Sequence, residues 1–163
     1  MDDYRARLYE RYVSSHVGVV SQGRTLSRDP LYKRIIKKHF PANKDAAILE
    51  LGCGHGAFIR KMSEYGYTNI QGVDFSSEQV EIAKKLEISN VRQKDLMQEL
   101  EDSENDTYDL IIAIDVIEHF NKMELLNLLD KINLALNEGG AHSSYAQRCI
   151  TIWRTDALRG LYP

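Results

Sequence analysis

Three glycines at alternate positions, Gly52, Gly54 and Gly56, follow a short apolar run at residues 48–51. The run predicts a buried strand, and the apolar spacing after it predicts a helix from about Ala57. A strand that turns through glycines into a helix N-terminus lets a ligand approach the bare backbone. This stretch therefore predicts a site for a nucleotide-type cofactor.

Strand and helix patterns alternate along the chain around this turn. Helical patterns cover residues 27–39, 57–65, 77–86 and 122–136, and strand patterns cover 48–51, 69–74, 90–94 and 108–114. Short crossovers between such units are typical of an α/β fold, a Rossmann-like mostly parallel sheet with helices on both faces. Ligands of such sheets bind beyond the C-terminal ends of the strands.

Each of the four predicted strands carries an acid at or beside its C-terminal end. These acids are Glu50, Asp74, Asp95 and Asp115. All four are therefore expected at the ligand-binding edge of the sheet.

The composition bounds the classes of protein that the chain can represent. Its 163 residues predict a single domain over 1–163, with a helical cap at 1–42, a cofactor-binding core at 46–140 and an atypical tail at 141–163. No apolar run approaches the roughly 20 residues of a membrane span, and no signal-peptide pattern is present, which predicts a cytoplasmic protein without a membrane partner. The net charge of −3 argues against a nucleic-acid partner.

The tail breaks the pattern of the core. A fifth strand is expected after Gly140, but residues 141–149 show no alternation, and β-branched residues gather only from Ile150. We therefore expect C-terminal strands that are truncated or irregular, through a shortened chain or a changed reading frame. An irregular but genuine C-terminus is the alternative. An open sheet edge would invite pairing with a second copy, as a homodimer.

Two cofactors compete for the glycine turn. Gly52, Gly54 and Ala57 fit the dinucleotide fingerprint, and Asp74 lies near the distance expected for a ribose-binding acid. S-adenosylmethionine also has a ribose and an adenine, but it carries cations and no phosphates. Glu50 would repel a pyrophosphate and attract a cation, which favours S-adenosylmethionine.

The core resembles the class I S-adenosylmethionine-dependent methyltransferases. Their four motifs match, in order, residues 50–56 (ELGCGHG), 72–76 (GVDFS), 93–96 (QKDL) and 109–119 (DLIIAIDVIEH). Residues 136–140 (LNEGG) are similar to the family's turn before strand five, which usually carries Lys-Pro. With Tyr12 and His16, the motifs look most like bacterial small-molecule methyltransferases of polysaccharide biosynthesis.

The resemblance implies roles at the methionine end of the cofactor. The backbone of Gly52, Cys53 and Gly54 would pass under the methionine moiety, with Glu50 near its ammonium group. Asp115 would lie near the methyl group.

The resemblance also implies roles at the adenosine end. Asp74 would accept hydrogen bonds from both ribose hydroxyls, and Phe75 would pack on the adenine face. Asp95 would take the adenine amino group, with Lys94 and Leu96 beside it.

His119 has two interpretations. With a pKa that is ordinarily near neutrality, it could act as general base for an acceptor hydroxyl, or it could border the pocket and orient Asp115. Glu118 and His119 are adjacent and lack a third ligand, so no metal site is expected. Cys53 is expected to be a packed residue and His55 an exposed variable one.

Tyr12 and His16 also leave two interpretations open. They belong either to a helix that caps the edge of the domain or to a lid that faces the ligand.

The sequence thus predicts a methyltransferase that acts on a small molecule, with a sugar hydroxyl as the preferred acceptor. The alternatives are an NAD-dependent oxidoreductase, for which no Tyr-x-x-x-Lys pair appears, and a truncated cofactor-binding module without catalysis.

Overall fold

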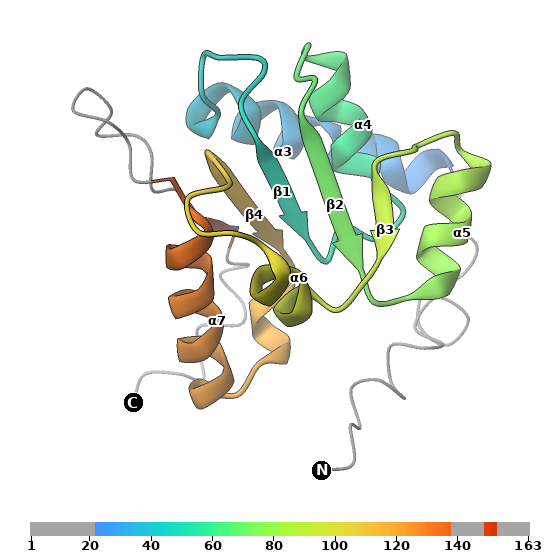
Figure 1. The fold of residues 1–163 in the computed structure, drawn as a ribbon. Helices are drawn as coiled ribbons and strands as arrows, with labels where there is room; N and C mark the ends of the chain where they lie inside the picture. The colour runs from blue at the N-terminus through green and yellow to red at the C-terminus, as the bar shows by residue number, and fades with distance from the viewer. Residues whose placement is uncertain (1–21, 138–148, 153–163) are drawn as a thin grey trace, which may run out of the picture.

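Parallel strands in the order β3-β2-β1-β4-β5 form the sheet of the computed structural model, which describes residues 22–137 and 149–152. The strands are β1 (Ile48–Leu51), β2 (Ile70–Asp74), β3 (Val91–Gln93), β4 (Leu110–Ile114) and β5 (Cys149–Ile152). The arrowheads of β1 to β4 point to one edge of the sheet (Figure 1). The loops after these strands therefore meet at that edge, as the sequence predicts.

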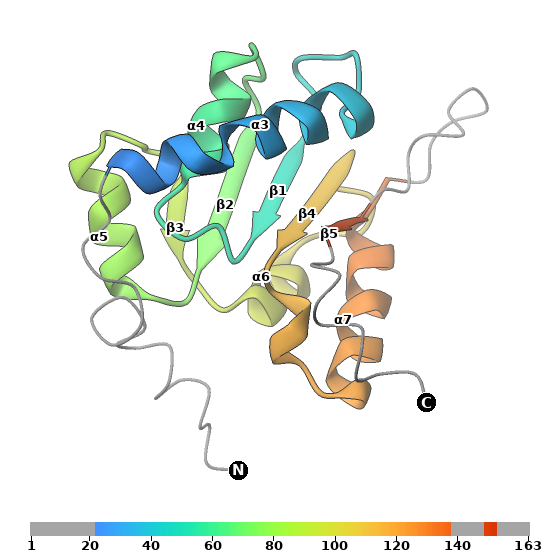
Figure 2. The ribbon, with the colours of Figure 1, turned by 180° about the vertical axis from the view of Figure 1, so that it is seen from behind.

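Helices cover both faces of the sheet (Figures 1 and 2). On one face lie α3 (Gln22–His39), α4 (Ala57–Glu64) and α5 (Ser77–Lys85), and on the other lie α6 (Leu96–Asp102) and α7 (Lys122–Ala135). The expected Rossmann-like arrangement with helices on both faces is confirmed.

The pleat of β1 decides where its carboxylate points. Ile48 packs into the core under α3 and α4, whereas Leu49 and Leu51 pack into the core under α6 and α7. Since successive side chains of a strand alternate between faces, Glu50 points to the α3 and α4 face. The single acid of this strand is therefore buried beneath α3.

A fifth strand corrects the expectation of a missing edge. β5 pairs with β4 in parallel register, with Ile112 opposite Ile150 and Ile114 opposite Ile152. The strand forms where the β-branched residues begin, beyond the polar stretch that obscured it. Residues 138–148 and 153–163 lie outside the described residues, as do Tyr12, His16 and the expected first helix.

Two short helices were not predicted. Helix α6 follows β3 directly, and a 3₁₀ helix, η1 (Ile117–His119), follows β4. Each is shorter than the window over which apolar periodicity can be read. Within the described residues, no helix is both long and apolar enough to cross a membrane.

Candidate functional site

The glycine turn brings the backbone of the β1–α4 connection to the ligand edge of the sheet. Gly52, Gly54 and Gly56 have φ of +66°, +56° and +77°, the left-handed region that favours glycine. A Cβ on Gly52 would lie 2.6 Å from Cγ2 of Val116, so a side chain cannot fit there without a shift of the η1 segment. The turn is therefore fixed both by its backbone conformation and by close packing.

Asp74, at the end of β2, links the glycine turn to the loop that follows β2. Its Oδ2 accepts the N–H of Gly54 at 2.7 Å, and its Oδ1 accepts the N–H of Ser76 at 2.9 Å. Burial raises the pKa of this carboxyl, and the two backbone donors oppose that rise. Each oxygen keeps a second lone pair, so the carboxylate can still accept from a vicinal diol.

Glu50 is the buried carboxyl of the site. Its side chain is only 4% exposed, and none of the described residues donates a hydrogen bond to its Oε2. Burial, with a smaller contribution from the nearby Asp74, raises the pKa of Glu50 to about 8. A buried carboxyl without a partner is costly, and a cation at this position would remove the cost. The chemistry of Glu50 therefore fits the ammonium or sulfonium of S-adenosylmethionine.

Helix α3 adds two side chains that the sequence did not single out. Arg28 Nη2 lies 2.8 Å from Oδ2 of Asp115, which follows β4. Tyr32 is buried one turn further on, stacks on Phe58 with ring centroids 4.6 Å apart, and its pKa is raised by burial and by Glu50. The spacing of Arg28 and Tyr32 at i and i+4 places both on the inner face of α3, and this spacing is the signal that could have found them.

Asp115 and His119 lie in the segment after β4. Asp115 has a φ of +55°, which is uncommon for a non-glycine residue and holds its side chain toward Arg28. His119 is exposed at the end of η1, where its backbone N–H donates a hydrogen bond to the carbonyl oxygen of Val116. The structure thus places both expected residues at the ligand edge and leaves the role of His119 a prediction.

The residues expected at the adenine divide into two groups. Phe75 is 37% exposed beyond β2, and Asp95 caps α6 by accepting the N–H groups of Met97 and Gln98 through Oδ1 alone. Phe75 and Oδ2 of Asp95 therefore remain available to a ligand.

The second group, Lys94 and Leu96, contacts the rest of the protein through its side chains. Lys94 Nζ lies 2.9 Å from Glu99 and 2.8 Å from Asp102, and the side chain of Leu96 packs against the core under α6 and α7. These contacts engage both side chains within the protein, which favours an adenine contact through the backbone of Lys94 and Leu96.

Cys53 and His55 fill the gaps between the glycines. Cys53 is buried, and its thiol has a pKa raised by burial, which agrees with a packed residue. His55 is half-buried and its Nδ1 lies 3.2 Å from Oε1 of Gln79, so it is less exposed than expected. Among the described residues, no group of three or more potential ligands could hold a metal ion.

The geometry agrees with a comparison against known families. The profile described as "Methyltransferase domain" matches residues 25–155, which is most of the chain. The chain belongs to the methyltransferase domain family. The methyl donor of this family is S-adenosylmethionine, in agreement with the expected cofactor and against the NAD alternative.

Curated relatives of this methyltransferase domain are named for different acceptors. It is 31% identical over 101 residues to the ubiquinone biosynthesis O-methyltransferase of Rickettsia bellii, a match that covers 60% of this chain and 42% of that protein. It is 35% identical over 85 residues to the pavine N-methyltransferase of Thalictrum flavum, which covers 48% of this chain and 23% of that protein. The match spans less than half the length of either relative.

Solved structures show the same fold. The magnesium protoporphyrin IX methyltransferase of Synechocystis, solved with bound S-adenosylmethionine, aligns with a TM-score of 0.57 at 20% identity. The alignment covers 80% of this chain and 71% of that one. At this identity the likeness confirms the class I methyltransferase fold of the domain and carries nothing further.

Proposed function

We propose that the chain binds S-adenosylmethionine at the glycine turn and directs methyl transfer to a small-molecule acceptor. The observation that carries the proposal is Glu50, a buried carboxyl whose Oε2 has no donor among the described residues. A cation stabilises the ionised form of such a carboxyl, whereas the pyrophosphate of NAD would oppose its ionisation.

The methionine moiety is assigned to the space between β1, β4 and α3. Its ammonium would face Glu50, and its carboxylate would face the guanidinium of Arg28, which supplies donors in a fork that matches a carboxylate. Arg28 forms an ion pair with Asp115, so the carboxylate of a bound methionine moiety would share that guanidinium with Asp115.

The adenosine moiety is assigned to the ends of β2 and β3. Asp74 supports this assignment, because its two oxygens hold the turn and keep lone pairs for the ribose hydroxyls. Phe75 would cover the adenine, and Oδ2 of Asp95 would accept from the adenine amino group, beside the backbone of Lys94 and Leu96.

When bound, S-adenosylmethionine would supply an activated methyl group on its sulfonium for transfer to an acceptor atom, with the neutral thioether as the leaving group. The chain contributes alignment, since holding two reactants in line supplies much of the acceleration. His119 and Asp115 follow β4, and we assign His119 to take the acceptor proton at a ring nitrogen when the acceptor is a hydroxyl.

A sugar hydroxyl stays the preferred acceptor class, supported by the resemblance to methyltransferases of polysaccharide biosynthesis. The quinone and alkaloid named for the relatives define the competing classes. The cytoplasmic location, the single-domain organisation, the absence of a nucleic-acid partner and pairing through the sheet edge also stay predictions. A truncated cofactor-binding module without catalysis also stays an alternative, although β5 supplies the fifth strand whose absence suggested it.

A transfer assay with a methyl-labelled donor tests catalysis. The purified protein is incubated with the labelled donor and fractionated cell extract. The variant is His119→Ala. The matched control is His39→Ala, because His39 ends α3 and lies away from the C-terminal ends of the strands. We expect label in a small-molecule fraction, a loss of at least about tenfold for His119→Ala, and little change for His39→Ala. Binding of the cofactor without label in any fraction would contradict the enzymatic proposal.

A further inference from the structure

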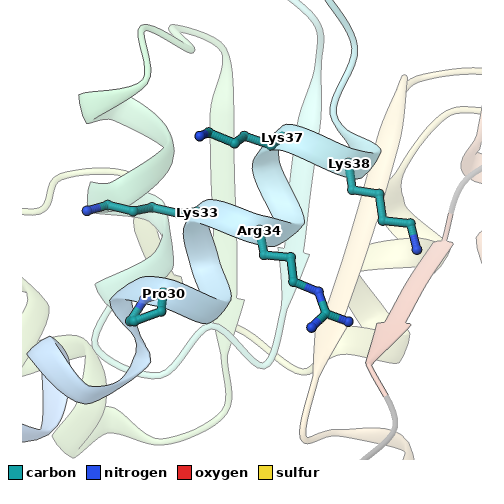
Figure 3. Close-up of a pocket in the computed structure, with 5 residues that line it drawn as sticks. All are labelled: Pro30, Lys33, Arg34, Lys37 and Lys38. Carbon is teal, nitrogen blue, oxygen red and sulfur yellow. The ribbon is translucent and has the colours of Figure 1, made fainter.

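The outer face of α3 gathers basic side chains. Lys33, Arg34, Lys37 and Lys38, with Pro30, line a shallow hollow of about 560 Å³ (Figure 3). Figure 3 shows two rows, with Lys33 and Lys37 extended to one side of the helix and Arg34 and Lys38 to the other. We call these four side chains the basic face of α3. The opposite side of the helix, with Tyr32, Ile35 and Ile36, is buried in the core.

Most of the charge of the basic face has no ion-pair partner in the part of the chain that the structure describes. Lys33 pairs with Asp29 at 2.7 Å. For Arg34, Lys37 and Lys38, the described residues provide no ion pair, and all three are exposed. Part of this arrangement follows from the favourable position of cations at a helix C-terminus. Three cations without an ion pair among the described residues, on a chain of net charge −3, nevertheless form a local positive field.

The shape and composition of the basic face define the partner. The hollow is lined by one exposed helix, so it lacks the walls that enclose a small ligand. None of its lining residues is aromatic, so it lacks the stacking platforms typical of single-stranded nucleic-acid sites. Long basic stems on one side of a helix suit a flat anionic surface, because the stems can bury while the charges meet head groups.

We propose that the basic face of α3 binds the surface of an anionic phospholipid bilayer. This contact is peripheral and needs no membrane-spanning helix, so it revises only the expectation of no membrane partner, which rested on the lack of an apolar run. Because Arg28 and Tyr32 lie on the inner side of the same helix, the contact would also hold the candidate site close to the membrane interface.

The expected binding is moderate and sensitive to salt. Each basic side chain near an anionic surface strengthens binding roughly fivefold, so Arg34, Lys37 and Lys38 together give on the order of 100-fold. Screening at high ionic strength should remove most of this gain.

Co-sedimentation of the full chain with lipid vesicles tests the proposal. The vesicles are phosphatidylcholine alone or with about one-third phosphatidylglycerol. The variant Arg34→Gln/Lys37→Gln/Lys38→Gln removes three charges from the basic face. The matched control Lys84→Gln/Lys85→Gln/Lys122→Gln removes three charges from exposed positions on α5 and α7.

We expect sedimentation with the anionic vesicles alone, its loss in about 0.5 M sodium chloride, and a loss on the order of 100-fold for the α3 variant. The control variant should stay within about threefold of the wild type. No binding, equal binding to neutral vesicles, equal losses in both variants, or binding to RNA instead of vesicles would each overturn the proposal.

Calorimetry with S-adenosylhomocysteine separates this proposal from the proposed function. The α3 variant should bind it as the wild type does, which also shows that the variant is folded. A variant that no longer binds vesicles but still binds S-adenosylhomocysteine supports the membrane contact independently of catalysis. A variant that loses the ligand as well would contradict a separate surface.

Discussion

Glu50 holds a proton that the bound cofactor should displace. The carboxyl is buried beside Asp74, and its pKa of about 8 means that it is mostly neutral at pH 7 without a ligand. A cation brought next to it favours the charged form. Ligand binding is therefore linked to the release of a proton.

We predict that binding of S-adenosylhomocysteine at pH 7 releases roughly 0.9 proton per site, the fraction of Glu50 that is protonated beforehand. Calorimetry in two buffers of different ionisation enthalpy measures this number. Glu50→Gln should bind more weakly and release close to no proton. A wild type that also releases none would show that Glu50 stays neutral in the complex.

The same carboxyl should make the ligand-free protein less stable as the pH rises. Its pKa is higher in the folded state than in the unfolded chain, so the folded state binds the extra proton and is favoured at low pH. We expect the contribution of Glu50 to the free energy of unfolding to be fully present below about pH 4.5 and lost toward pH 8, at up to about 1.4 kcal/mol per pH unit. Urea titrations should show this slope in the wild type and its loss in Glu50→Gln. Equal pH dependence in the wild type and in Glu50→Gln would contradict the raised pKa of Glu50.

Asp74 supplies a second test at the scale of one side chain. Asp74→Asn should weaken the binding of S-adenosylhomocysteine by at least about 1.5 kcal/mol, the scale of a charge-assisted hydrogen bond. The matched control is Asp109→Asn, because Asp109 also accepts a backbone N–H, that of Ala47, but lies at the opposite end of the strands. Calorimetry that shows equal losses for both variants, or none for Asp74, would remove Asp74 from the site.

At the scale of one element, the β1–α4 turn is held by packing against the segment after β4. Gly52→Ala brings a methyl group to within 2.6 Å of Val116, whereas Gly66→Ala has the same left-handed strain and open space. We predict that Gly52→Ala lowers the free energy of unfolding by about 1–3 kcal/mol more than Gly66→Ala does.

A double-mutant cycle with Val116→Ala checks the cause of that difference in urea unfolding. The truncated side chain should recover most of the excess cost of Gly52→Ala. Additive losses would show that contact with Val116 does not constrain the turn.

The elements differ in how far the sequence could predict them. The turn at 50–56 was predicted because the spacing of glycines is a local signal. Asp74 was predicted because a strand that ends in an acid is also a local signal. Arg28 and Tyr32 were not predicted as site residues, because their approach to Asp115 and Glu50 depends on how α3 crosses the sheet. Helix α6 is a single capped segment too short for its periodicity to be read.

For the whole molecule, the alternation of strands and helices predicts the parallel sheet with helices on both faces, but it does not predict the edge strand β5. β5 forms at Cys149–Ile152, after a stretch without the strand pattern, and its pairing with β4 is a long-range contact. The division of the site between α3 and the strand ends is likewise a property of the assembled fold. The hollow along the basic face of α3 is likewise visible only in the structure.

We expect this fold to bind a cationic cofactor rather than a dinucleotide. Calorimetry of the purified chain with S-adenosylhomocysteine and, separately, with NADH tests it most directly. We expect saturable binding of S-adenosylhomocysteine and no heat of binding with NADH. Binding of NADH alone would contradict it.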